Sequence, residues 1–295
     1  MKTELPERSR PHGAYIYPIR DAILEHHKNK IAFVILFGSF ARGDWVYDNY
    51  WKDHIRYEYA SDYDFLVVTK QRKHGSGATA MRIADEINQS LEKFYDISEK
   101  HTPTVIVESL RRVNRDLAKG HYFFTDIIKK DGILLYDSGE FELSDAKPLS
   151  KAQMKEKAED YFEQWFTAGR EFLIDARNAL ERNSFNISAF YLHQATENIL
   201  NCALLVLTDY KPKLHDIKKL LKLCASQSSK FLGIFTTATP EERKCFKLLR
   251  DAYIGARYDK DYKITKEQLE YLIIRIENLR DVVGKVCKER INSLV

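Results

Sequence analysis

The sequence predicts an α+β protein, with a mixed β-sheet and flanking helices in its N-terminal part and an all-α helical bundle after it. Two observations support this prediction. Strand-like and helix-like patterns alternate up to about residue 145, and strand-like patterns nearly vanish beyond it. The chain has 295 residues, which favours two domains over one, so we expect domains at residues 1–145 and 146–295.

The strands of the first domain are predicted from short runs of β-branched, aliphatic and aromatic residues. The run Ile31–Phe37 is the longest and leads into Gly38-Ser39, as expected for a buried strand that ends in a turn. Apolar residues at helical spacing predict a helix over residues 78–95. Further strand patterns occur at Ile55–Tyr59, Asp62–Thr69, Thr104–Val107 and Ile133–Tyr136.

The second domain is predicted to be helical because its apolar residues recur with a 3.6-residue period. The first helix follows Pro148–Ser150 and ends near Asn183-Ser184. The others are expected at about Asn186–Thr208, Leu214–Ala225, Pro240–Arg257 and Lys266–Lys288. Capping boxes, in which a Ser or Thr precedes a Glu or Gln by three residues, are predicted at Ser150, Thr239 and Thr265.

Composition argues against several classes of protein. The 47 basic and 43 acidic residues leave a net charge of +4, which is too small to indicate a nucleic-acid partner by itself. No apolar run reaches the roughly 18 residues of a membrane span. The first residues lack the apolar core of a signal peptide, so we expect a cytoplasmic protein. Its four cysteines are widely spaced, which favours buried free thiols over a disulfide framework or a zinc site.

Asp62 and Asp64 are the first candidates for chemistry. Residues two apart on a strand face the same side, so the two carboxylates would lie close together while Tyr63 points the other way. Two such acids repel unless a cation lies between them or one stays protonated. Their hard oxygen ligands suit magnesium, which keeps bound waters and bridges to substrate phosphates. An isolated Asp-x-Asp is also common on exposed strand ends that hold no metal.

The turn at Gly38-Ser39 is the second candidate. A strand that runs directly into Gly-Ser and a helix start presents backbone N–H groups that suit phosphate oxygens, although Gly-Ser after a strand is often only a turn. Gly38 would let a phosphate chain approach the backbone, Ser39 would add a hydroxyl donor, and Arg42 would supply a guanidinium. A triphosphate loop and a metal-binding acid pair are the minimum set for nucleotidyl transfer, an in-line attack on the α-phosphorus.

Together these motifs resemble a known signature. The run Gly38–Gly43, followed by Ser61–Asp64, is similar to the GSxARG…SDxDL pattern of the DNA polymerase β-like nucleotidyltransferase superfamily. The closest branch is that of the minimal nucleotidyltransferases, which are similar to the kanamycin nucleotidyltransferase type. The resemblance covers about residues 15–140.

The resemblance implies a role for each motif residue. Gly38 and Ser39 would contact the triphosphate of an NTP, with ATP as the expected donor. Asp62 and Asp64 would bind one or two Mg²⁺ ions. The implied reaction is transfer of an NMP, expected to be AMP, to a hydroxyl acceptor such as an aminoglycoside-like small molecule, a protein tyrosine or an RNA end.

Two features depart from the family pattern. The family usually has a third carboxylate on a later strand, but the matching strand here has Thr104 or Val105 at that position, and Glu108 at its end is the candidate substitute. Without a third acid, proton abstraction lacks an obvious base. The segment Asp44–Ala60 is longer than in most relatives and is rich in aromatic residues, which would either stack a base in a hairpin over the site or form a small local core.

Residues from about 150 to 290 resemble a HEPN domain, the helical partner often found beside minimal nucleotidyltransferases. The matching pieces are Leu192–Glu197, Tyr210–Asp216 and Ala252–Tyr258. Many HEPN domains are RNases that use an Arg-x4–6-His motif. Here Tyr262 stands where the histidine after Arg257 would be, and a tyrosine does not shuttle protons near neutral pH. We therefore do not expect RNase activity from that motif.

Other roles of the helical domain are implied by the resemblance. Some related HEPN domains bind nucleotides, and a phosphate-binding patch would combine Lys211, Lys213, His215 and Arg257. The alternative is that the lysines lie in a solvated loop and that His193 and His215 are structural residues. Related nucleotidyltransferases adenylylate tyrosines of their HEPN partners, which makes Tyr258 and Tyr262 candidate acceptors. The resemblance also implies a homodimer formed through the helices.

Two functions follow from these observations. The first is a magnesium-dependent nucleotidyltransferase fused to a HEPN domain. The second is a nucleotide-binding regulatory or toxin–antitoxin-like module with weak or no turnover, which the missing third carboxylate and the missing histidine favour. An RNase with a nonstandard HEPN site is a weaker third option.

Overall fold

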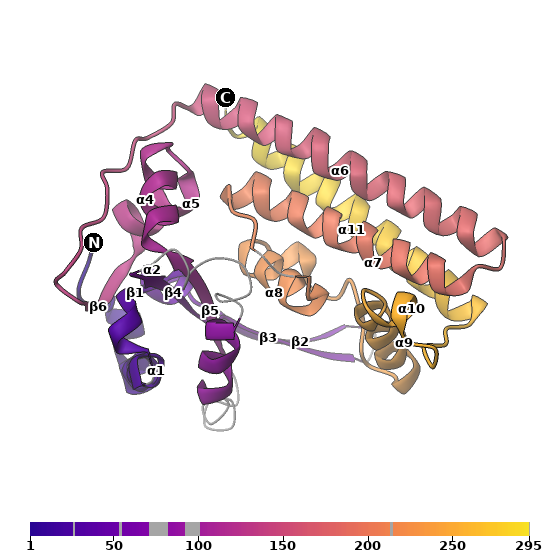
Figure 1. Cartoon of the computed structure of the whole chain (residues 1–295), viewed down its shortest axis with the longest axis horizontal. Helices are drawn as coiled ribbons and strands as arrows, with labels where there is room; N and C mark the ends of the chain where they lie inside the picture. Colours follow the sequence, from indigo (N-terminus) through magenta and orange to yellow (C-terminus); the bar gives the residue numbers. More distant parts are fainter. Residues whose placement is uncertain (26, 53–54, 71–81, 92–100, 213–214, 295) are drawn as a thin grey trace. The chain divides into compact units, whose positions relative to one another are not determined.

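The computed structural model describes residues 1–25, 27–52, 55–70, 82–91, 101–212 and 215–294. The chain divides into two compact units, Met1–Leu149 and Ser150–Val295. The first unit holds the β-sheet and the second is helical (Figure 1). The predicted fold class is therefore confirmed.

A four-stranded mixed sheet forms the centre of the N-terminal unit, in the order β5-β4-β1-β6. Strand β1 pairs antiparallel with both of its neighbours, whereas β4 and β5 are parallel. The run predicted as the most buried strand is β1, and the other three strands also lie where apolar runs predict them. The strands are β1 (Ile31–Phe37), β4 (Tyr63–Thr69), β5 (Pro103–Ser109) and β6 (Ile133–Asp137).

Helices cover both faces of this sheet. On one face α1 (Gly13–Glu25) and the helix over residues 82–91 pack against a core that includes Tyr63 and Phe65. Figure 1 shows α4 and α5 on the opposite side. Because side chains alternate along a strand, Asp64 points away from the core that holds Tyr63 and Phe65. The short elements on this unit are η1 (Glu7–His12), η2 (Lys28–Lys30), α2 (Gly38–Arg42), α4 (Leu110–Ala118), α5 (Tyr122–Asp126) and η4 (Ile127–Asp131).

The segment Asp44–Ala60 contains a separate two-stranded hairpin. Its strands β2 (Tyr47–Lys52) and β3 (Ile55–Ala60) pair antiparallel. Before the hairpin, Trp45 stacks on Phe40 with 5.3 Å between ring centroids, so this aromatic residue joins a local core. The expected base stacking also rests on the aromatic residues Tyr50, Trp51, Tyr57 and Tyr59, whose side chains the structure does not describe.

The helical unit is built on three long helices that run side by side (Figure 1). They are α6 (Lys151–Glu181), α7 (Phe185–Thr208) and α11 (Lys266–Asn292). Shorter elements complete the unit: α8 (Ile217–Gln227), η5 (Ser229–Phe231), α9 (Pro240–Asp251) and α10 (Gly255–Tyr258). The three predicted capping boxes are confirmed, at Ser150, Thr239 and Thr265.

One predicted helix is divided in two. The sequence predicts a continuous helix over Pro240–Arg257, but α9 ends at Asp251 and the chain turns before α10 begins at Gly255. A Cβ atom at Gly255 would lie 2.8 Å from Cδ2 of Tyr262. The glycine therefore lets the Tyr262 ring pack against the turn, and Arg257 lies on a separate short helix.

The cysteines behave as free thiols in the core. All four are buried and unpaired, as the sequence predicts: Cys202, Cys224, Cys245 and Cys287. Burial raises the pKa of the Cys224 thiol, so this side chain stays protonated at neutral pH. Among the described residues, no helix combines the length and apolar character needed to cross a bilayer.

Candidate functional site

The turn between β1 and α2 brings backbone against a carboxylate. Phe37, the last residue of β1, pairs with Asp64 of β4. The next residue, Gly38, has a φ of +74°, which disfavours residues with a side chain. A Cβ atom there would lie 2.3 Å from Oδ2 of Asp64. Only a glycine can therefore join the strand to the helix at this distance from the carboxylate.

The two aspartates are held by the neighbouring strand. Asp62 directly precedes β4, Asp64 is its second residue, and both are buried. The Thr102 hydroxyl donates to Oδ1 of Asp62 at 3.0 Å, and the Thr104 hydroxyl donates to Oδ2 at 3.4 Å. These bonds orient the Asp62 carboxylate, and Tyr63 between the acids is fully buried in the core.

The two carboxylates are of the residue type that could hold a magnesium ion together with substrate and water oxygens. Among the described residues, no three or more His, Cys, Asp or Glu side chains are grouped so that they could hold a metal. Magnesium is commonly bound through one or two carboxylates, with waters and phosphate oxygens filling the other positions. Asp62 and Asp64 would supply the carboxylates, and the Gly38 turn lies against the Asp64 carboxylate.

The structure does not bring Glu108 to the two aspartates. In the parallel β4–β5 register Thr104 stands beside Asp64, whereas Glu108 pairs with Val68. This is four residues further along the strand, about 13 Å away. Glu108 is buried and forms an ion pair with Arg112 of α4. The strand position beside Asp64 is therefore occupied by a neutral hydroxyl, and Glu108 takes part in a structural ion pair.

The other residues of the turn lie at its rim. The Ser39 carbonyl accepts hydrogen bonds from the N–H groups of Gly43 and Asp44, which close the short helix α2. Nε of Arg42 donates to Asp44 at 3.0 Å, and Nη1 lies 3.7 Å from Asp131. The Arg42 side chain is partly exposed, so a phosphate could reach its guanidinium only in competition with these carboxylates.

A cluster of aromatic side chains packs against the Gly38 turn, and the sequence motifs did not predict it. Nδ1 of His12 and the hydroxyl of Tyr63 form a 2.8 Å hydrogen bond. Nδ1 of His101 donates to the Ser61 carbonyl at 2.7 Å. Burial and the neighbouring His101 lower the pKa of His12, so His12 is neutral at physiological pH. The cluster fixes the backbone on both sides of Asp62, and its members are too far apart in sequence to form a motif.

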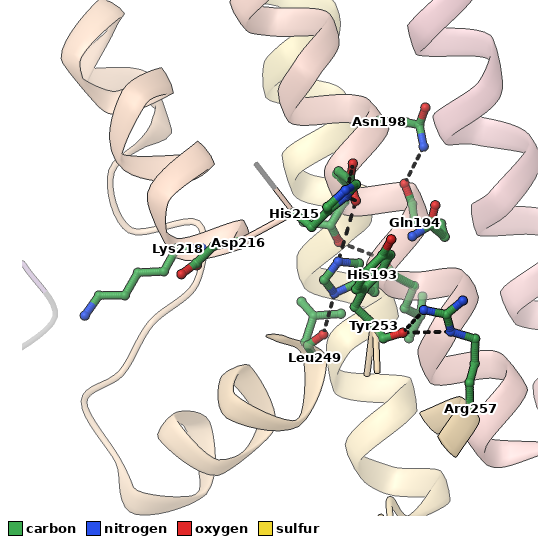
Figure 2. Close-up of polar contacts among 12 residues, drawn as sticks. His193, Gln194, Asn198, His215, Asp216, Lys218, Leu249, Tyr253 and Arg257 are labelled. Atoms are coloured by element: carbon green, nitrogen blue, oxygen red, sulfur yellow. Dashed lines mark hydrogen bonds and ion pairs between the residues drawn. The ribbon is translucent and has the colours of Figure 1, made fainter. Parts of the chain in front are cut away.

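The helical unit holds a second group of polar residues, drawn in Figure 2. Helix α7 carries His193 and Glu197 one turn apart. Nδ1 of His193 donates to the Leu249 carbonyl at 3.0 Å, and its Nε2 lies 3.7 Å from Glu197. His215, just before α8, donates from Nδ1 to the Glu197 carboxylate at 3.0 Å. One buried glutamate thus lies between a buried histidine and a half-exposed one.

The charge state of Glu197 is set by its two histidines. Burial alone raises the pKa of Glu197, but hydrogen bonds and charge from His193 and His215 more than offset this effect. The net pKa therefore lies below its usual value of 4.5, and Glu197 is ionised at neutral pH. An ionised glutamate accepts the hydrogen bond from Nδ1 of His215 and so fixes the orientation of this imidazole.

This assignment predicts a pH-dependent stability. Glu197 binds fewer protons in the folded than in the unfolded chain below pH 4.5, so its contribution is present above that pH and is lost as the pH falls through the folded pKa. At pH 7, Glu197→Gln should lower the free energy of unfolding by about 1–3 kcal/mol. Calorimetry from pH 7 to pH 3.5 should show this difference shrinking below pH 4.5. The exposed Glu171→Gln is the control, and a pH-independent difference would contradict the assignment.

Tyr253 connects His215 with Arg257. The imidazole of His215 stacks on the Tyr253 ring at 4.6 Å between centroids, with 10° between the planes. Nε of Arg257 donates to the Tyr253 carbonyl at 2.7 Å, and its guanidinium carbon lies 4.8 Å from the same ring centroid. Figure 2 shows the three side chains close together. A histidine and an arginine therefore both lie against one aromatic ring.

Of the two lysines in the predicted phosphate-binding patch, the structure describes only Lys211. Nζ of Lys211 lies 5.1 Å from the ring centroid of Trp165 on α6, in a cation–π contact. Lys213 lies outside the described residues. The structure thus brings His215 and Arg257 together around Tyr253. It also shows Lys211 in contact with another aromatic ring.

The two candidate acceptor tyrosines differ in accessibility. Tyr258 is 75% exposed. Tyr262 is only 7% exposed, and its hydroxyl donates to the Leu248 carbonyl at 2.9 Å. Burial raises the pKa of Tyr262 further above its usual value. The expectation that Tyr262 accepts a nucleotidyl group is therefore corrected, because its oxygen is buried and bonded to the main chain.

Sequence reasoning missed Glu197 and Tyr253 as members of this group. A His and a Glu four residues apart share one face of a helix, so the spacing of His193 and Glu197 was an available signal. The partner His215 lies in the segment between α7 and α8, so its position depends on how α8 packs against α7, which the spacing does not reveal.

Comparisons with known proteins identify the helical part. The HEPN domain family matches residues 162–287. A solved structure of an archaeal HEPN homologue is 17% identical, with a TM-score of 0.25, and the match covers 45% of this chain and 97% of the homologue. No curated protein matches the sequence. Residues 162–287 of this chain, which span most of α6 through α11, therefore form a HEPN domain.

Proposed function

We propose that the N-terminal unit transfers a nucleoside monophosphate from an NTP, with ATP as the expected donor, to a hydroxyl acceptor. The observation that supports this most directly is the contact between the Gly38 backbone and the Asp64 carboxylate. A polyphosphate lying on the Gly38 turn would have its oxygens next to a carboxylate that holds magnesium. This proximity is what nucleotidyl transfer requires, because the metal must touch both protein and phosphate.

Each residue has a defined part in the proposed reaction. Magnesium, when bound, would stabilise the charge on the attacking and leaving oxygens. Asp62 and Asp64 would hold it, and the hydroxyls of Thr102 and Thr104 keep the Asp62 carboxylate oriented. The absence of a side chain at Gly38 lets the Asp64 carboxylate lie against the backbone of the turn, so a metal held by Asp64 would be close to phosphates bound there.

A second candidate is a nucleotide-binding module with little turnover, and the register of β5 favours it. Thr104, which is neutral, stands beside Asp64 where a third carboxylate would serve as general base. Without that base, deprotonation of the acceptor would be slow. A HEPN domain indicates a nucleotide-related or RNase-like module, which is compatible with either candidate. Homodimer formation through this domain remains a prediction.

Binding and turnover together distinguish the two candidates. Calorimetric titration of the full chain with ATP measures the affinity with and without Mg²⁺. Pyrophosphate release in the presence of a panel of hydroxyl acceptors measures turnover. Transfer predicts magnesium-dependent binding and pyrophosphate release, whereas the regulatory module predicts binding alone. Absence of ATP binding would contradict both candidates, and ATP binding that does not depend on Mg²⁺ would contradict the transfer.

The HEPN domain is proposed to bind the phosphate of a nucleotide at Arg257 and His215. Replacing Arg257 by glutamine should weaken nucleotide binding to this domain about 10-fold, since a charge-assisted hydrogen bond contributes about 1.5–3 kcal/mol. The measurement is a titration in the Asp64→Asn background, which removes the magnesium-dependent binding proposed for the N-terminal unit. Arg243→Gln is the control, because Arg243 is also exposed and bonded to backbone carbonyls. Equal affinities of the two variants would count against the site.

A further inference from the structure

A hollow lies between α6 and α11 of the HEPN domain and shares no lining residue with the group around Tyr253. Its volume is about 460 Å³, within the range of ligand sites. A smaller hollow of about 120 Å³ shares Arg170 and Arg280 with it and reaches Arg177. The lining residues are Phe166, Arg170, Arg280, Asp281, Gly284, Lys285 and Lys288. We call the two hollows together the α6–α11 groove.

Helical spacing explains the groove. Phe166, Arg170 and Arg177 recur at intervals of four and seven residues, which places them on one face of α6. A Cβ atom at Gly284 of α11 would lie 3.3 Å from Cζ of Phe166, so the glycine lets the edge of this ring pack closely against α11. Arg177 forms an ion pair with Glu277 at the other end. The groove therefore follows about 17 Å of the helix axis.

The groove carries unneutralised positive charge. Arg280 pairs with Asp281, and Arg177 pairs with Glu277. Within the part of the chain that the structure describes, Arg170, Lys285 and Lys288 form no ion pair, and all three are exposed. The whole chain has a net charge of only +4, so this concentration of cations is local. Cations gathered in a hollow attract a polyanion.

A pair of stacked aromatic rings indicates which class of polyanion the groove would bind. Phe162 and Phe166 stack at 4.6 Å between centroids with 18° between their planes, and both are half-buried. Phe166 lines the groove beneath the cations. Basic side chains beside an aromatic ring are typical of single-strand nucleic-acid sites, where phosphates meet cations and bases stack on rings. An acidic peptide would use the cations but would have no need of the ring.

We propose that the α6–α11 groove binds a short stretch of single-stranded nucleic acid. Arg170, Lys285 and Lys288 contact phosphates, and a base lies against Phe166. This site is independent of the proposed transfer at Asp62 and Asp64, and it uses none of the residues assigned there.

The test measures binding of a fluorescein-labelled 12-nucleotide RNA to the full chain by fluorescence anisotropy. Lys285→Glu/Lys288→Glu should weaken binding at least about 30-fold. For this variant, the slope of log affinity against log salt concentration between 50 and 200 mM should be smaller in magnitude by about 1.4, because two phosphate contacts are lost. Lys244→Glu/Lys263→Glu makes the same change of charge at exposed lysines outside the groove, and should alter affinity less than 3-fold.

Further arms identify the ligand. Phe166→Leu, with its thermal unfolding checked, should weaken RNA binding at least 5-fold while leaving the salt slope unchanged. Equal losses in the two double-lysine variants would overturn the groove as the site. Equally tight binding of poly-glutamate, or of an RNA duplex, would overturn the assignment to single-stranded nucleic acid. ATP turnover is expected to be the same in all groove variants, so this outcome is separate from that of the proposed transfer.

Discussion

Replacing Asp64 by asparagine is expected to lower nucleotidyl transfer by about 100- to 1,000-fold. The carboxylate lies against the Gly38 turn, where it would join magnesium to the polyphosphate. An asparagine side chain keeps the shape but loses the negative charge and presents an amide group to the metal. The fold should survive, because removing one of two neighbouring acids also relieves their repulsion. Pyrophosphate release at saturating Mg²⁺, with thermal unfolding measured in parallel, checks both expectations.

The same variant is informative if the wild-type chain binds ATP without turnover. In that case Asp64→Asn should abolish the magnesium dependence of ATP affinity in the N-terminal unit. Asp21→Asn is the control, because Asp21 lies exposed on α1, away from the turn. If Asp64→Asn releases pyrophosphate at the wild-type rate, or if its ATP affinity depends on Mg²⁺ as in the wild type, the assignment of the metal site to Asp64 is wrong.

The strands of the N-terminal unit were predictable because they are local apolar runs. Ile31–Phe37 is buried along almost its whole length, so its sequence carries a continuous hydrophobic signal. The pairing between strands was not predictable in the same way. The parallel register that stands Thr104 beside Asp64 joins positions forty residues apart. The sequence left Thr104 and Val105 as alternatives, and only the register selects the threonine.

In the helical unit, too, local sequence patterns predict some features and fail to predict others. Capping residues such as Ser150 and Thr265 mark helix starts through local hydrogen bonds, and the sequence reveals them directly. Tyr258 and Tyr262 are four residues apart and looked equivalent as acceptors. The chain turns between them, so one ring points to solvent and the other packs over Gly255. Burial of an individual side chain in a turn depends on tertiary contacts, which no local pattern reports.

Replacing Gly38 by alanine is expected to destabilise the N-terminal unit by about 2–4 kcal/mol and to abolish transfer. Two effects add to this loss of stability. A residue with a side chain at a φ of +74° is strained by about 1–2 kcal/mol. In addition, the Cβ atom of the alanine would collide with Oδ2 of Asp64. Gly139→Ala separates them, because Gly139 has a φ of +72° and no atom lies within 4 Å of the position that a Cβ would take there. Calorimetry should show a smaller loss for Gly139→Ala, close to the strain alone.

A double-mutant cycle tests whether the collision involves Asp64 itself. If Cβ of residue 38 strikes the carboxylate, Gly38→Ala should cost less in an Asp64→Ala background, where the colliding oxygen is absent. The strain at φ +74° remains in both backgrounds, so the difference isolates the contact. A cost that is unchanged by Asp64→Ala, or equal to that of Gly139→Ala, would mean that backbone and carboxylate are not in contact. The proposed position of the polyphosphate beside Asp64 would then lose its physical basis.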